Sequence, residues 1–199
     1  MRRRVLTAIL ACIVTAGLAP GAGAQAPEKP KLTIAVGGKA AFYYLPLTIA
    51  EQRGYFKEEG LDVEIVDFVG GSAALRAVVG GSADVVSGAY EHTINLQASK
   101  QYFKAFVLQG RAPAISLGVS AKAKYRTPAD LKGMKIGVSA PGSSTNMMVS
   151  YFLARHGMKG SDVSIVGVGT GNAALAAIRL GQIDALSNVD PVMTMLEQR

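Results

Sequence analysis

The 199-residue sequence predicts an α/β fold made of two related lobes. Short apolar runs rich in β-branched residues alternate with helical segments, a pattern typical of a parallel, doubly wound sheet. Residues 73–88 also align without gaps with residues 173–188, and seven of the sixteen pairs are identical. An offset of 100 residues is too long for a solenoid repeat, so it indicates two lobes of similar construction.

The first predicted lobe covers residues 32–120. Pro46 suits the first turn of its first helix, and Gly60 suits that helix's end. Residues 61–65 alternate between apolar and acidic side chains, which favours a strand with one protected face. The expected elements are strand 32–36, helix 43–56, strand 61–68, helix 70–79, strand 85–87, helix 91–100, strand 103–109 and strand 115–120.

The second predicted lobe covers residues 121–199 and repeats this scheme. It begins with the linker-like segment 122–130, which places the lobe boundary near residue 120. The expected elements are strand 135–138, helix 144–156, strand 164–168, helix 172–180, strand 185–187 and helix 191–198.

The N-terminus has the pattern of a secretory signal peptide over residues 1–24. Arg2, Arg3 and Arg4 precede an apolar run over residues 5–19, and 22–24 supply small residues for cleavage. Residues 25–31 are then a polar linker. An alternative is lipidation at Cys12. Because Cys12 is the sole cysteine, the mature chain would hold no disulfide, thiolate metal site or cysteine nucleophile.

Composition and motifs exclude several function classes. Lys and Arg total 21 against 14 Asp and Glu, but the basic residues are scattered, which argues against a nucleic-acid partner. The sequence has no G-x-S-x-G elbow and no dinucleotide or phosphate-loop spacing. No His and carboxylate pair has metal-ligand spacing. We therefore expect a binding protein with no catalytic residues, metal or cofactor.

The candidate site lies in polar turns where strands lead into helices. Ligands of open α/β sheets bind beyond the carboxyl ends of the strands, and a helix N-terminus favours an anion there. The alternative for each turn is plain N-capping. Residues 143–146 offer more oxygens than one cap needs, so they are the first choice. The candidate ligand-binding residues are Tyr43, Tyr44, Ser72, Tyr90, Ser143, Ser144, Thr145, Asn146, Asn188 and Asp190.

Aromatic and histidine side chains are weaker candidates. Tyr43, Tyr44 and Tyr90 could stack on a ligand, although a position facing the core is an equal alternative for the first two. His92 lies near a predicted helix start and His156 near a helix end. Lone histidines in such positions are expected to be surface or capping residues.

Several segments together resemble one family. Residues 54–64, GYFKEEGLDVE, are similar to the first-helix signature of nitrate/sulfonate/taurine-type (SsuA/THI5-like) periplasmic substrate-binding proteins of ABC transporters. Segments 70–72, 81–84, 127–133 and 181–185 match the family in the same order. The resemblance covers residues 31–199. It implies a type II periplasmic-binding-protein fold, a monomer in the periplasm that closes on a small molecule, and an inner-membrane ABC permease as partner.

The resemblance leaves three questions open. Family members continue beyond the point that corresponds to residue 199, so we expect an incomplete second lobe and a fragment or truncated chain. A sensor module is an alternative to transport, and gene neighbourhood would discriminate between them. Helix N-termini favour a sulfonate, nitrate or carboxylate ligand, whereas the tyrosines would suit a neutral heterocycle such as a thiamine pyrimidine precursor. Related thiamine-pyrimidine synthases use a cysteine cluster that a cysteine-free mature chain would lack.

Overall fold

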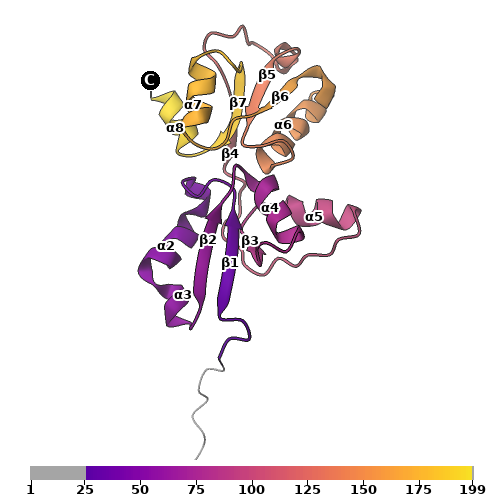
Figure 1. Cartoon of the computed structure of the whole chain (residues 1–199). Coiled ribbons are helices and arrows are strands. Elements are labelled where there is room, and N and C mark those ends of the chain that lie inside the picture. The colour runs from indigo at the N-terminus through magenta and orange to yellow at the C-terminus, as the bar shows by residue number, and fades with distance from the viewer. Residues whose placement is uncertain (1–25, 199) are drawn as a thin grey trace, which may run out of the picture.

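The computed structural model describes residues 26–198. The chain forms two α/β lobes stacked end to end (Figure 1). The predicted signal peptide, including Cys12, lies outside the described residues. No helix within residues 26–198 is long and apolar enough to span a bilayer.

The first lobe has a three-stranded parallel sheet in the order β2-β1-β3. Successive residues of its central strand face opposite sides, as the period of a strand requires. Ile34 and Val36 pack with Leu47, whereas Ala35 packs with Ala74. The elements are β1 (Lys31–Val36), η2 (Phe42–Tyr44), α2 (Leu45–Arg53), α3 (Tyr55–Glu58), β2 (Asp62–Asp67), α4 (Gly71–Val79), β3 (Val85–Val86) and α5 (Glu91–Ala98).

Two expectations for this lobe need correction. The predicted helix 43–56 is divided at Gly54, whose φ of 79° ends α2 in the left-handed conformation before α3 begins. Pro46 does lie in the first turn of α2. The predicted strand 103–109 is irregular instead, and the side chain of Phe106 is 75% exposed. An apolar run becomes a strand only where a neighbour completes its hydrogen bonds, and this segment pairs with no described strand.

The second lobe has a four-stranded sheet in the order β4-β7-β5-β6. Its strands are parallel except for β4, which pairs with β7 in the antiparallel direction. The elements are β4 (Ile115–Val119), η3 (Pro128–Leu131), β5 (Lys135–Val138), α6 (Ser144–Arg155), η4 (Gly160–Asp162), β6 (Ser164–Gly167), α7 (Asn172–Arg179), β7 (Ala185–Val189) and α8 (Val192–Glu197).

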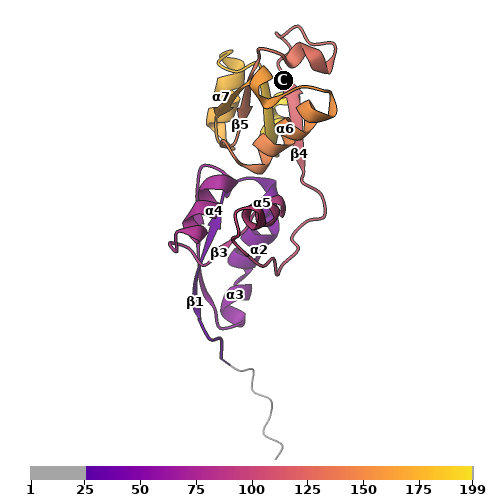
Figure 2. The ribbon, with the colours of Figure 1, turned by 90° about the vertical axis from the view of Figure 1, so that its right-hand side faces the viewer.

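Strand β4 corrects the assignment of residues 115–120 to the first lobe. Its residue Leu117 pairs with Ser187 of β7, so β4 belongs to the second sheet. The segment between α5 and β4 carries the chain from one lobe to the other (Figure 2). Ile115 and Val189 also pack against Ile34 and Val36 of the first lobe. An apolar contact therefore joins the two sheets close to this crossing.

The internal repeat corresponds to the same structural unit in both lobes. Each copy comprises a helix, a left-handed glycine at Gly81 or Gly181 and an aspartate that precedes a strand. Asp84 Oδ2 accepts the Thr33 N–H at 2.9 Å, and Asp184 Oδ2 accepts the Lys135 N–H at 2.8 Å. Each carboxylate thereby fixes the start of the repeat's strand beside the lobe's central strand.

Candidate functional site

A cavity of about 50 Å³ lies between the two lobes. Gly37, Gly88 and Ser139 in its wall follow the carboxyl ends of β1, β3 and β5. Ligands of open α/β sheets bind at such ends. The volume corresponds to about three to four waters. Polar or aromatic side chains in the wall include Tyr43, Tyr44, His92, Ser139, Ser143, Ser144, Thr145 and Thr170.

The N-terminus of α4 directly contacts the turn that opens α6. Ser72 Oγ donates to the Pro141 carbonyl oxygen at 2.9 Å, and the Ser72 N–H donates to Ser143 Oγ at 3.3 Å. A Cβ at Gly70, where φ is 130°, would lie 3.1 Å from Ser143 Oγ. Only glycine suits both this backbone conformation and this close approach. The two helix N-termini therefore meet across the interface between the lobes.

Most side chains of residues 143–146 are occupied by local hydrogen bonds. Ser143 is buried against Ser72, with their Oγ atoms 3.3 Å apart. Thr145 Oγ1 accepts the Ser139 N–H at 3.0 Å, and Asn146 Oδ1 accepts the Gly142 N–H at 2.9 Å. These three side chains stabilise the turn. None of them caps α6, because its N-cap residue Ser143 makes no side-chain capping hydrogen bond. The ligand-binding roles of these residues stay a prediction.

Ser144 and the backbone N–H groups at the start of α6 are different. Ser144 lines the cavity, and its hydroxyl makes no hydrogen bond within residues 26–198. The N–H groups of Ser144 and Thr145 likewise have no acceptor in this part of the chain. The first N–H groups of a helix lack partners inside the helix and carry its positive dipole end. The site thus has donors suited to an anion.

The three tyrosines occupy three different environments. Tyr44 is 5% exposed, and its hydroxyl accepts the Gly37 N–H at 3.1 Å; burial raises its pKa to about 12. Tyr44 is therefore mainly a core residue with one edge at the cavity. Tyr43 is half-buried in the wall, and its ring meets that of Tyr44 edge to face at 5.0 Å. Tyr90 is 64% exposed and lies outside the cavity wall.

Asn188 and Asp190 are placed to hold backbone rather than to face the cavity. The Asn188 side chain is fully buried, where Nδ2 donates to the Gly169 carbonyl and Oδ1 accepts the Val189 N–H, both at 2.9 Å. Asp190 Oδ1 accepts the Thr194 N–H of the first turn of α8 at 3.0 Å. Neither is part of the cavity wall. Their predicted contact with a ligand has no support from this geometry.

His92 is the cavity residue that sequence reasoning misjudged. The expected surface position is wrong, since the residue is 6% exposed and lines the cavity. Its Nε2 is buried and has no hydrogen-bond partner within the described chain. Burial lowers the pKa of His92, and the nearby Glu91 carboxylate opposes that shift. No pattern in the sequence distinguishes this lone histidine from a surface one.

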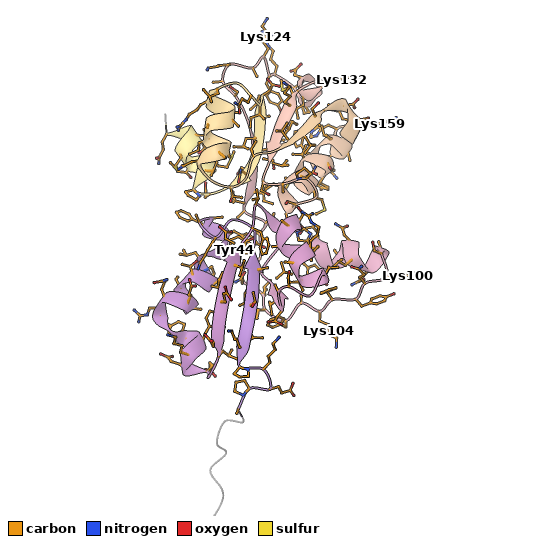
Figure 3. All side chains as sticks on the ribbon, viewed as in Figure 1. Tyr44, Lys100, Lys104, Lys124, Lys132 and Lys159 are labelled. Atoms are coloured by element: carbon orange, nitrogen blue, oxygen red, sulfur yellow. The ribbon has the colours of Figure 1, made fainter. Side chains whose placement is uncertain are left out.

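Fixed charges are sparse around the cavity. No Asp, Glu, Lys or Arg is among the described residues that form its wall, where His92 is the sole basic side chain. Figure 3 shows Lys124, Lys132 and Lys159 on the outer parts of the second lobe, away from Tyr44 at the boundary. Across residues 26–198, no three His, Cys, Asp or Glu side chains gather as a metal site. The positive character of the cavity therefore comes from helix N-termini.

Two related α/β lobes with a cavity between them define a type II periplasmic-binding-protein fold. Among solved structures, a Bordetella bronchiseptica protein is 67% identical with a TM-score of 0.84, over 85% of this chain and 54% of that one. The NMT1/THI5-like family model matches residues 41–199, and the chain belongs to this family. The predicted substrate-binding-protein fold and the predicted SsuA/THI5-like family are thereby confirmed.

Further relatives differ in what their names describe. The alkanesulfonate-binding protein SsuA of Xanthomonas axonopodis pv. citri, bound to MOPS, is 25% identical with a TM-score of 0.65, over 87% of this chain and 59% of that one. The nitrate-binding protein NrtA of Synechocystis is 18% identical with a TM-score of 0.58, over 83% of this chain and 48% of that one. At this identity the likeness shows the fold alone.

Curated relatives include proteins with and without an enzyme name. A 4-amino-5-hydroxymethyl-2-methylpyrimidine phosphate synthase of Saccharomyces cerevisiae is 27% identical over 161 residues, which is 78% of this chain and 45% of the yeast protein. A Brucella abortus relative is 29% identical over 171 residues, or 84% of this chain. The chain spans about half the length of the curated relatives it matches.

Proposed function

We propose that this chain is part of an extracytoplasmic solute-binding protein that captures a small anion and delivers it to an ABC permease. The observation that carries the proposal is the pair of unpaired N–H groups of Ser144 and Thr145 at the cavity. No acidic side chain is among the described residues that line this wall. Sulfonate, nitrate and carboxylate groups suit these donors.

The similarity to SsuA supports the anion class, because the name of that protein refers to alkanesulfonates. The alternative is a neutral heterocycle, which the half-buried ring of Tyr43 would suit. The yeast relative is named as a synthase of a pyrimidine phosphate, whose ring, without the phosphate, is a heterocycle of this kind. Binding without catalysis is our proposal for this chain.

A ligand screen separates these alternatives. Thermal unfolding is measured with ethanesulfonate, nitrate, acetate or 4-amino-5-hydroxymethyl-2-methylpyrimidine. A ligand at about 100 times its Kd adds about 2.7 kcal/mol to the free energy of unfolding, so a true ligand should raise the Tm clearly. We expect at least one anion to do so. A rise with the pyrimidine and none with the anions would contradict the anion proposal.

A pair of variants at Ser144 tests the backbone donors directly. Ser144 is the first residue of α6, a position that tolerates proline, and Ser143 before it already has the extended conformation that proline requires (φ −79°, ψ 168°). Ser144→Ala removes the hydroxyl, whereas Ser144→Pro also removes the N–H. We expect Ser144→Pro to bind the identified anion at least about tenfold more weakly than Ser144→Ala, since hydrogen bonds to charged groups contribute about 1.5–3 kcal/mol.

Calorimetric titration gives the two affinities, and circular dichroism checks that both variants fold. Equal affinities for Ser144→Ala and Ser144→Pro would show that the N–H of Ser144 does not hold the ligand.

A further inference from the structure

The buried side chain of His92 makes no hydrogen bond within the described residues that would explain its position in the fold. It comes from the first turn of α5 and lies in the cavity wall, where side chains of both lobes meet. Its Nε2 is buried and has no hydrogen-bond partner within residues 26–198. A buried polar group of this kind is costly unless something satisfies it. The cavity is the place from which a ligand could do so.

The neighbours of His92 bring it close to the helix N-termini. A Cβ at Gly71, the first residue of α4, would lie 3.1 Å from His92 Nε2. Nε2 is therefore adjacent to the backbone at the start of that helix. Because α4 meets the α6 turn through Ser72 and Ser143, the imidazole and both helix N-termini face one small volume.

Among the described residues, Glu91 places a carboxylate beside this imidazole. Glu91 Oε1 lies 3.9 Å from His92 Nε2, and it too is buried without a hydrogen-bond partner among the described residues. Burial raises the pKa of Tyr43 in the cavity wall, and the charge of Glu91 raises it further. The carboxylate's field thus extends to the place where a ligand would bind.

The other groups that face His92 do not titrate near neutral pH. Tyr43 and Tyr44 of η2 are phenols whose pKa values are raised. The cavity residues from α4, from the start of α6 with its N-cap, and from β7 are Gly71, Ser143, Ser144, Thr145 and Val189, which carry no charge. Among the described residues of the wall, His92 is therefore the group that exchanges a proton near neutral pH.

We propose that His92 is a ligand-contacting residue and that an anion binds in this cavity together with one proton, which His92 holds between the ligand and Glu91. The inference rests on the proposed anion-binding function. With a neutral imidazole, an anion would enter a small cavity near an uncompensated carboxylate. With a protonated imidazole, the N–H of the buried Nε2 can donate to an anion in the cavity, while the Glu91 carboxylate 3.9 Å away offsets the positive charge of the ring.

Proton uptake makes affinity depend on pH in one direction. Burial keeps the pKa of free His92 below its usual value, so the free cavity holds a neutral imidazole at neutral pH. A bound anion favours the protonated form and raises that pKa. Between the two pKa values, binding takes up one proton and the affinity falls by up to about tenfold per pH unit as the pH rises.

The test uses ethanesulfonate as the probe, since a sulfonate does not itself titrate between pH 5.5 and pH 8.5. Calorimetry in two buffers of different ionisation enthalpy measures both the Kd and the number of protons taken up. We expect binding to take up nearly one proton in wild type and about none in His92→Gln. At pH 6, we expect His92→Gln to bind ethanesulfonate at least about tenfold more weakly than wild type does. His156→Gln is the matched control, because His156 is exposed and hydrogen-bonded to the Phe152 carbonyl at 2.8 Å.

A second measurement uses the wild-type chain alone, so it does not depend on the folding of a variant. NMR with ethanesulfonate follows the Ser144 amide as a report on occupancy and the His92 ring nitrogens as a report on protonation. Shifts in the resonances of both groups, together with a raised His92 pKa, support the proposal. A shift in the Ser144 amide resonance without a change in the His92 ring resonances overturns the proposal, and so does an affinity that does not depend on pH. Either result leaves the proposed function intact. No response of either group to ethanesulfonate contradicts sulfonate binding and, with it, this inference.

Discussion

Strands β3 and β7 occupy equivalent places in the internal repeat, yet their burial differs. All five residues of β7 are buried, whereas both residues of β3 are half-buried. Strand β7 lies between β4 and β5, while β3 pairs with β1 alone among the described strands. Similar sequences therefore gave the same topology but not the same environment. The number of flanking strands therefore determines how deeply the strand of each repeat is buried.

The largest expected effect comes from truncating the equivalent residues Leu186 and Val86. Leu186 is nearly fully buried in the core of the second lobe, so Leu186→Ala should lower the free energy of unfolding by about 3 kcal/mol. Val86 is half-buried, and Val86→Ala should lower it by about 1 kcal/mol. Urea unfolding monitored by circular dichroism measures both. Equal losses would show that the flanking strands do not determine the difference.

A smaller effect concerns the two histidines, one in each lobe. The pKa of His92 is lowered by burial, so the unfolded chain takes up its proton at a higher pH than the folded chain does. Stability in the absence of ligand should therefore fall as the pH drops below about 6.5, the usual histidine pKa. His92→Gln should reduce this loss between pH 7 and pH 5, as measured by Tm. His156→Gln should leave it nearly unchanged, and an equal effect of both variants would contradict the assignment.

The smallest effect is expected at Asp84, one of the two repeated aspartates. Its pKa is lowered, first by the hydrogen bond from Lys29 and then by that from the Thr33 N–H. The stability that this carboxylate contributes is present above its unfolded pKa and is lost as the pH falls through the folded value. Asp84→Asn should therefore flatten the acid limb of a Tm against pH curve below about pH 4. Lys29→Met should reproduce part of this change, and an unaltered acid limb in both variants would contradict it.

The regular elements could largely be predicted because each depends on local sequence. The alternation at Leu61, Val63 and Ile65 predicted β2, and Gly60, which marked a helix end, has a left-handed φ of 74°. The repeat of residues 73–88 predicted equivalent units in the two lobes. By contrast, the apolar run 103–109 predicted a strand that did not form, because strand formation also requires a neighbour that a local pattern does not supply.

The candidate site was predictable in position and less so in its individual residues. Turns at the carboxyl ends of strands indicated the cavity, and Tyr43 and Ser144 do line it. Asn188 and Asp190 have the same residue types, but they hold backbone groups instead. A side-chain oxygen that could bind a ligand is, in the sequence, identical to one that caps a helix.

The sequence by itself determined the alternation of strands and helices, the doubling of the lobe and the turns at which helix N-termini gather. These properties depend on short-range periodicity and on residues such as glycine that set the local backbone. Only the tertiary structure decided that β4 joins the second sheet, that the hydroxyls near Ser144 serve the turn, and that His92 lies buried in the cavity wall. Each of these depends on which distant segments come into contact, and a single chain's local pattern does not specify its partners.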